Sequence, residues 1–184
     1  MDFIRHSELE GYHAFLGAST YSWINYDLDK LSDRYRSHLQ KQRGTELHAF
    51  AAEAIRLGIK IVQNHTTLSM FVNDAIGYRM TPEQPLFYSA NCFGTADAIS
   101  FKKNFLRIHD LKTGVTPASM SQLKIYAALF CLEYEKDPNE IKIELRIYQS
   151  DEIVVLEPEP EDITYIMDKI RIFDERIEEL KEGE

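Results

Sequence analysis

The chain has 184 residues, of which 44% are hydrophobic and 28% charged, and its formal net charge is -9. This length allows one domain with a substantial core, and no apolar run in it is long enough to span a bilayer. The N-terminus lacks the charged-then-apolar layout of a signal peptide, so we expect a cytoplasmic protein. The two cysteines, Cys92 and Cys131, are too few for an iron–sulfur cluster or a zinc ribbon.

The excess negative charge lies in the C-terminal segment. Residues 151–184 hold 13 acidic and 4 basic residues, whereas residues 1–150 are neutral overall. The acidity of the whole chain therefore does not exclude a nucleic-acid partner for the part that precedes this segment.

The first part of the chain favours helices. Residues 3–16 predict a short helix, and residues 27–42 predict a loop or an exposed helix. An apolar stripe at helical spacing predicts a further helix over residues 44–57. Residues 66–78 predict another helix, with Thr66 or its neighbour as the capping residue.

The hydrophobic period then changes from that of a helix to that of a strand. Pro82 and Pro85 predict a loop, after which residues 86–92, 93–101 and 105–112 predict three strands. A short polar turn separates the last two strands, so we expect them to form a hairpin.

The second half alternates helices and strands. Residues 117–134 predict a helix, residues 141–148 a half-buried strand with alternating apolar residues, and residues 151–156 a further strand. Two prolines precede a charged last helix at about residues 161–181, within the segment 158–184. This order predicts a single domain of the α/β class over the whole chain, with a mixed central sheet flanked by helices.

A cluster of charged residues falls on the predicted hairpin. Asp97 lies in the first strand, and the triplet Asp110-Leu-Lys112 ends the second. Because residues i and i+2 of a strand share a face, Asp110 and Lys112 should project together, next to Asp97. Two carboxylates and an ammonium group can hold a divalent metal and a phosphate, which is the equipment of a metal-dependent phosphodiesterase.

Each of these residues also has a structural interpretation. Asp97 could be a strand-end residue in a turn, but its neighbours suggest a buried segment in which a carboxylate needs a partner. Asp110 and Lys112 could form a surface pair, but alternation places them on the face of Leu106 and Ile108, which should be packed.

Four sequence elements occur in a defined order between residues 18 and 148: Gly44-Thr-Glu-Leu-His48, Gly94-Thr-Ala-Asp97-Ala-Ile, Asp110-Leu-Lys112-Thr-Gly and Gln122-Leu-Lys-Ile-Tyr126. Together they resemble the motifs of the PD-(D/E)XK nuclease superfamily, in its RecB-like and lambda-exonuclease-like branch. Ala96 stands where the nominal motif has a proline, and the cysteine cluster that some members carry is absent from the sequence.

The resemblance implies a restriction-endonuclease-like core and a site for Mg²⁺ or Mn²⁺. The implied metal ligands are His48, Asp97, Asp110 and the carbonyl group of Leu111. The implied catalytic residues are Asp97, Asp110, Lys112, Gln122 and Tyr126. A neutral imidazole among the ligands would suit Mn²⁺ better than Mg²⁺. Taken alone, a helical histidine such as His48 would be a core or surface residue.

The implied function is that of a metal-dependent deoxyribonuclease. We expect an exonuclease that acts on DNA ends in recombination, repair or phage DNA processing, in a bacterial or phage-infected cell. Arg43 and Lys124 are candidate contacts to DNA phosphates. The alternatives are a non-catalytic DNA-binding or assembly protein that keeps the fold, and an unrelated hydrolase of small phosphoesters. The apolar stripe of the last helix would dock on the core or on a second subunit of a homo-oligomer.

Overall fold

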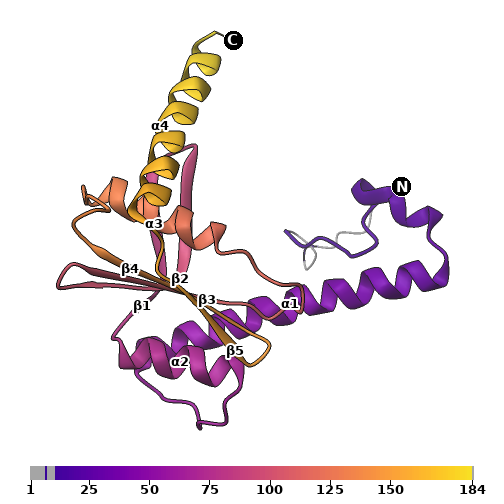
Figure 1. Cartoon of the computed structure of the whole chain (residues 1–184). Coiled ribbons are helices and arrows are strands. Elements are labelled where there is room, and N and C mark those ends of the chain that lie inside the picture. The colour runs from indigo at the N-terminus through magenta and orange to yellow at the C-terminus, as the bar shows by residue number, and fades with distance from the viewer. Residues whose placement is uncertain (1–6, 8–10, 184) are drawn as a thin grey trace. The chain divides into compact units, whose positions relative to one another are not determined.

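The structure is a computed structural model that describes Ser7 and residues 11–183 (Figure 1). The chain divides into two compact units, Met1–Thr45 and Glu46–Glu184. The first unit contains the 3₁₀ segment η2 (Ala18–Asn25) and the first part of helix α1 (Leu28–Leu57). Within this unit the indole N–H of Trp23 donates a hydrogen bond to the carbonyl oxygen of Gly17 at 2.9 Å.

Helix α1 differs from the sequence-based expectation in its length. Residues 27–42 were expected to be a loop or an exposed helix, and most of them are helical and continuous with the expected helix over residues 44–57. The helix expected over residues 3–16 falls partly on residues outside the described ones. Residues 11–16 contain turns and irregular backbone, so the prediction is wrong for this part.

The second unit is built around a five-stranded sheet. Its elements after α1 are α2 (Thr67–Gly77), β1 (Thr81–Ser89), β2 (Cys92–Lys102), β3 (Phe105–Leu111), α3 (Ser121–Glu133), β4 (Lys142–Gln149), β5 (Glu152–Leu156) and α4 (Pro160–Glu182). The strand order is β1-β2-β3-β4-β5, and only β3 and β4 pair in parallel. Helix α3 makes the crossover that a parallel pair requires. The expected mixed sheet flanked by helices is therefore confirmed.

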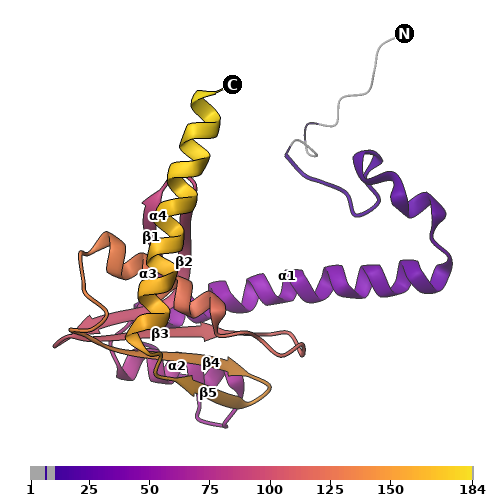
Figure 2. The same cartoon turned by 45° about the horizontal axis from the view of Figure 1, so that its top comes forward.

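Helices cover both faces of this sheet (Figures 1 and 2). Helices α3 and α4 lie on one face, and α2 lies on the other with the last turns of α1. The core on the α3 face includes Leu106, Ile108 and Leu123, and the core on the α2 face includes Ala51, Phe71 and Leu111. The parallel pair β3–β4 is thus covered on both sides, as parallel strands usually are.

Local sequence signals explain several of these boundaries. The two residues between β2 and β3, Lys103 and Asn104, have φ values of 51° and 56°. Two consecutive left-handed residues form the turn whose twist fits a tight hairpin. The Thr66 side chain caps α2 by accepting a hydrogen bond from the Ser69 N–H, which satisfies one of the free donors of the first turn.

The loop expected at Pro82 and Pro85 is wrong, because both prolines lie inside strand β1. They pair in register with Ala98 and Thr95 of β2. A proline cannot donate a ladder hydrogen bond, but β1 is an edge strand of the sheet and has only one partner strand. The prolines therefore mark a sheet edge.

Two other boundaries also differ from expectation. Helix α3 begins at Ser121 and not at Pro117, because the preceding segment is tied to β4: the Ala118 N–H donates to the Gln149 side chain at 3.1 Å. Strand β4 is covered on both faces rather than half-buried, with Glu144 only 9% exposed and Tyr148 fully buried. Helix α2 packs on the face that was expected to meet solvent, and the Arg107 side chain of β3 pairs with Glu144 there.

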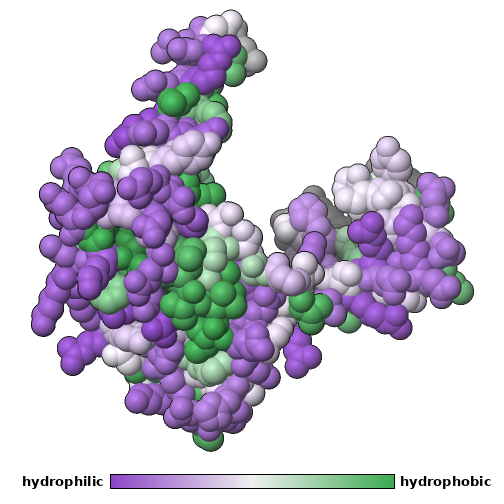
Figure 3. Space-filling model, viewed as in Figure 1, coloured by the Kyte–Doolittle hydropathy of each residue, from purple (hydrophilic) through white to green (hydrophobic). Residues whose placement is uncertain are grey.

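Helix α4 docks on α3 through Ile163, Met167 and Ile170, which are buried. Its outer part is mostly hydrophilic in Figure 3, and an apolar patch lies beside its lower end in that view. The apolar stripe of this helix was expected to dock on the core or on a second subunit, and in the structure it docks on the core. Among the described residues, no helix combines the length and hydropathy needed to cross a membrane.

Candidate metal and phosphate site

Three side chains from three elements of the second unit meet at one point. His48 of α1, Glu83 of β1 and Asp97 of β2 each offer one ligand atom, and these atoms lie within 4.8 Å of one another. The Nδ1 atom of His48 is 3.4 Å from an Asp97 carboxylate oxygen. All three side chains are partly buried, so a bound ion could be both held and reached.

The local backbone explains why Asp97 is fixed there. Strands β2 and β3 pair as far as Ala98 and His109 and then separate. Beyond this point an Asp97 carboxylate oxygen accepts a hydrogen bond from the Leu111 N–H at 2.8 Å. The side chain thus takes the place of a ladder partner and leaves its other oxygen directed at His48.

The backbone at Glu83 is strained. Its φ is 49°, in the left-handed region, in the middle of strand β1. Such a conformation costs a side-chain-bearing residue about 1–2 kcal/mol. Strain of this kind gathers at functional sites, where the surrounding structure maintains it.

A second group of polar residues begins at the end of β3. Asp110 is buried, and one of its carboxylate oxygens accepts a hydrogen bond from the Lys112 ammonium group at 3.1 Å. The other oxygen is 3.0 Å from the same nitrogen, in a geometry that makes an ion pair but no hydrogen bond. Among the described residues this buried oxygen has no hydrogen-bond donor, and the ion pair with Lys112 is its polar contact.

Helix α3 extends this group. Lys112 also donates to the Gln122 side-chain oxygen at 2.9 Å, and the Gln122 amide donates to the Tyr126 hydroxyl group at 2.9 Å. Four residues therefore form one chain of hydrogen bonds that starts at Asp110. The i, i+4 spacing of Gln122 and Tyr126 places both on the same side of the helix.

Charge repulsion and burial shift the pKa values of this site. Hydrogen bonding to Asp97 raises the pKa of His48. Burial raises the pKa of Asp110, and the charge of Asp97 raises it further against the opposing effect of Lys112. Burial and the charge of Asp97 likewise raise the pKa of Glu83. Three carboxylates thus compete for too little positive charge, a situation that a divalent cation would relieve.

The donor set fits a hard or borderline divalent ion. Carboxylate oxygens suit Mg²⁺ and Mn²⁺, and the imidazole nitrogen of His48 favours Mn²⁺. A cavity of about 250 Å³ opens beside Lys112 and Thr113, where the start of α2 and Leu47 of α1 form its walls. The Lys112 side chain as a whole is 30% exposed, so solvent reaches part of it.

The other residues predicted for the site lie away from the metal group or form contacts with other parts of the fold. Leu111 donates its N–H to Asp97 and buries its side chain in the core. Lys124 pairs with Asp162 of α4 at 2.6 Å, so its ammonium group links two helices. Arg43 is exposed on α1, in the first unit.

Glu83 is a candidate ligand that the sequence motifs did not predict. Its neighbours Pro82 and Pro85 predicted a loop, which concealed the strand that carries it. Pairing β1 with β2 in register would have placed Glu83 opposite Asp97, and this is the signal that could have found it.

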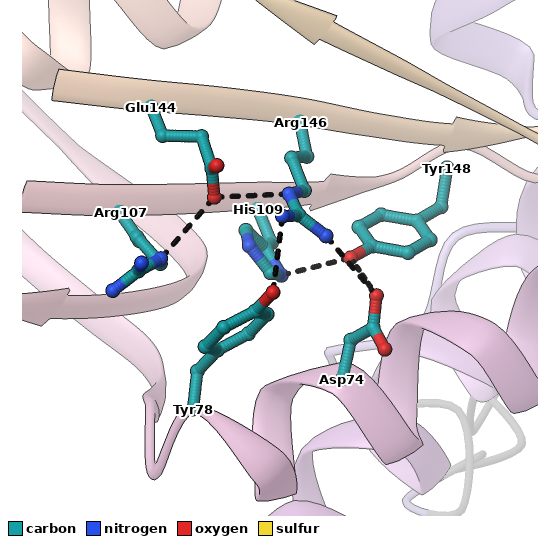
Figure 4. A network of polar contacts seen from close by, with 7 residues as sticks. All are labelled: Asp74, Tyr78, Arg107, His109, Glu144, Arg146 and Tyr148. Atoms are coloured by element: carbon teal, nitrogen blue, oxygen red, sulfur yellow. Dashed lines mark hydrogen bonds and ion pairs between the residues drawn. The ribbon is translucent and has the colours of Figure 1, made fainter.

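A second polar cluster lies on the α2 side of the same strands (Figure 4). The Tyr148 hydroxyl group donates to Asp74 at 2.7 Å and lies 3.1 Å from the Nδ1 atom of His109. Because the single hydroxyl proton goes to Asp74, the N–H of His109 must point at the Tyr148 oxygen. Burial and the charges of Arg146 and Arg107 lower the pKa of His109 to about 3, so it stays neutral.

The cations of this cluster are also satisfied. Arg146 donates to Glu144 at 3.0 Å, to Tyr78 at 3.1 Å and to Asp74 at 3.3 Å, and Arg107 donates to Glu144 at 3.2 Å. These bonds join β3, β4 and the end of α2 (Figure 4). The cluster therefore stiffens the strands that carry the site.

No protein-family model matches the chain, and no curated protein or solved structure gives a significant match to it.

Replacing Gly94 by alanine should disturb Tyr126. A Cβ atom at Gly94 would lie 2.9 Å from the Tyr126 ring, too close for β2 and α3 to keep their spacing. Overpacking of this kind costs about 1–3 kcal/mol, and we expect Gly94→Ala to lower the free energy of unfolding by such an amount in urea titrations. Gly77→Ala is the control, because a Cβ atom there meets nothing within 4 Å. Equal stability of the two variants would contradict this reading of the contact.

Mn²⁺ affinity should rise with pH through the raised pKa of His48 and level off above it. The protonated imidazolium ion has no lone pair for a metal, and its raised pKa keeps it protonated to higher pH than an ordinary histidine. Below that pKa we expect a loss of about tenfold per pH unit, measured by isothermal titration calorimetry. His48→Asn should bind Mn²⁺ more weakly and with a flatter pH profile. An identical profile in the variant would remove His48 from the ligand set.

Removing the Tyr148 hydroxyl group should destabilise the fold. Tyr148→Phe leaves the N–H of the buried His109 without an acceptor and removes one of the two donors to Asp74, which keeps its bond from Arg146. An unsatisfied buried group such as this N–H costs about 1–3 kcal/mol. Denaturant unfolding should show this loss, whereas Tyr165→Phe, at a residue 62% exposed, should change little. If Tyr148→Phe leaves the free energy of unfolding unchanged, the hydroxyl group is not needed for stability, and water must replace it.

Proposed function

We propose that this protein is a metal-dependent deoxyribonuclease with a PD-(D/E)XK core. The observation that carries the proposal is the hydrogen-bonded set of Asp110, Lys112 and Gln122 beside the His48, Glu83 and Asp97 group. The order of a helix, a three-stranded antiparallel unit, a crossover helix and a parallel strand agrees with the resemblance seen in the sequence.

Each group has a chemical role in this proposal. His48, Glu83 and Asp97 would hold the ion, and Asp110 would offer the carboxylate oxygen that has no hydrogen bond as a further ligand. A bound divalent cation polarises the scissile phosphate and lowers the pKa of its water. Lys112, fixed by Asp110 and Gln122, orients the attacking water and offsets the charge that develops on phosphorus.

The reaction is hydrolysis of a phosphodiester bond. Water adds to phosphorus, the bond to the 3′ oxygen breaks, and the products are a 5′-phosphate and a 3′-hydroxyl group. We infer exonuclease action on DNA ends, in recombination, repair or phage DNA processing inside the cell. This choice follows the resemblance of Gly44-Thr-Glu-Leu-His48 to an element of end-processing enzymes.

The non-catalytic alternative has less support from the geometry. A scaffold gains little from a buried carboxylate with one oxygen left without a hydrogen bond, because such a group costs folding free energy. It also gains nothing from the strained backbone of Glu83 beside two other ionisable groups.

The proposal is tested with end-labelled linear DNA and circular DNA in Mg²⁺ and in Mn²⁺. We expect the wild type to degrade linear DNA, and we expect Asp110→Asn and Lys112→Ala to lower the rate by about 10²-fold or more. Only Asp110→Asn should also weaken Mn²⁺ binding. Asp168→Asn, at a solvent-exposed acid of α4, is the control and should keep full activity.

Three outcomes would contradict the assignment. Near wild-type cleavage by either site variant would show that the active site lies elsewhere. DNA binding without cleavage in either metal would favour the non-catalytic alternative. Turnover of bis(p-nitrophenyl) phosphate without any action on DNA would favour a small-phosphoester hydrolase.

A further inference from the structure

The β1–β2 hairpin carries a pair of exposed aromatic rings. Phe87 and Phe93 are cross-strand partners, and 52% and 68% of their surfaces are exposed. Their ring centroids are 6.4 Å apart and their planes differ by 27°, so the rings are stacked. Two adjacent aromatic side chains directed at solvent form an apolar surface that folding alone does not require.

This pair lies on the same face of the hairpin as the candidate metal ligands. Alternation along β2 places Phe93 and Asp97 on one face, while Ala96 and the β1 residue Leu86 point into the core on the other. Phe87 is the cross-strand partner of Phe93, and Glu83 lies beside Asp97 in the metal group. Asp97 lies four positions after Phe93, which corresponds to about 13 Å along a strand. A continuous surface therefore leads from the metal group to the rings.

The surface between Asp97 and the ring pair is uncharged. Pro85 and Thr95 pair across the two strands there, and both are exposed. The Phe87 N–H donates a hydrogen bond to the Glu133 carboxylate at 3.0 Å, which places a negative charge next to the ring pair. A phosphate group would be repelled at this end, whereas a flat uncharged ring system would not.

The tip of the hairpin is held in place by α4, beside which it lies in Figures 1 and 2. The Asn91 side chain donates to Asp174 at 2.8 Å, and Lys181 donates to Asn91 at 2.7 Å. Ser89 donates to the same Asp174 carboxylate. The rings are thus presented on a braced strand pair, which lowers the entropy lost when a ligand binds.

We propose that Phe87 and Phe93 form a stacking site for unpaired DNA bases, and that the enzyme therefore prefers single-stranded ends. This inference rests on the proposed nuclease function, because it places the scissile phosphate at the metal group and the neighbouring bases on the rings. Stacking on exposed aromatic side chains is a common way to bind single strands without sequence preference. The bases of a duplex are stacked inside the helix behind the phosphate backbone, so they cannot reach the two rings.

The test measures the binding of labelled oligo-dT and of the same strand annealed to its complement. The protein is the full chain carrying Asp110→Asn, in Mn²⁺, so that hydrolysis is suppressed. Adding Phe93→Ala or Phe87→Ala should weaken single-strand binding about tenfold and leave duplex binding unchanged. Phe93→Trp should keep single-strand affinity. Phe173→Ala removes another ring, 57% exposed, from α4 and should have no effect.

Kinetics in the otherwise wild-type chain give a second readout. Phe93→Ala should raise the KM for single-stranded DNA with little change in kcat, and should not alter turnover of bis(p-nitrophenyl) phosphate, which has no base to stack. If the wild type cleaves DNA but the Phe variants lose nothing, or lose single- and double-strand binding equally, the stacking site is wrong and the nuclease proposal stands. If the wild type cleaves no DNA, the nuclease proposal fails and the stacking site fails with it.

Discussion

The burial of Asp110 beside Lys112 is the constraint on which the site depends. A buried carboxylate must be paired, and here a single ammonium group serves it while also bonding to Gln122. Glu83 and Asp97 add two more carboxylates nearby, which a single lysine cannot neutralise. Burial and the charge of Asp97 therefore raise the pKa of Asp110 against the opposing effect of Lys112.

The two faces of the central strands carry different polar groups. Asp110 lies with Lys112 and α3 on one side, while the adjacent residue His109 joins the buried network with Tyr148 on the other. Alternation along β3 makes this division unavoidable. The network on the α2 side pairs its arginines, and its burial and positive charges keep His109 neutral, so β3 and β4 form a stiff support for the Asp110 carboxylate.

Local spacing explains how much of this could be predicted. The Asp110 and Lys112 pair follows from an i, i+2 relation and the Gln122 and Tyr126 pair from an i, i+4 relation, so sequence alone brings their members together. Glu83 was not predicted as a ligand, because its proximity to Asp97 depends on the pairing of two strands. The contact of Asp74 with Tyr148 joins residues 74 positions apart, and no periodicity predicts such a pair.

Lys124 is a residue for which local spacing predicted a role, but a contact distant in sequence occupies its side chain. Its position in the Gln122–Tyr126 element made it a candidate phosphate contact, but Asp162 of α4 approaches it from 38 residues later in the chain. The acidity of α4 is thus partly used in contacts within the fold.

Hydrogen bonds from Ser89 and Asn91 lower the pKa of Asp174, and those from Lys181 and Asn91 lower the pKa of Glu178. A lowered pKa means that these contacts hold at neutral pH and are lost only as the pH falls through it. The acidic helix therefore braces the hairpin next to the site, and the net charge of the chain overstates the repulsion that DNA would meet there.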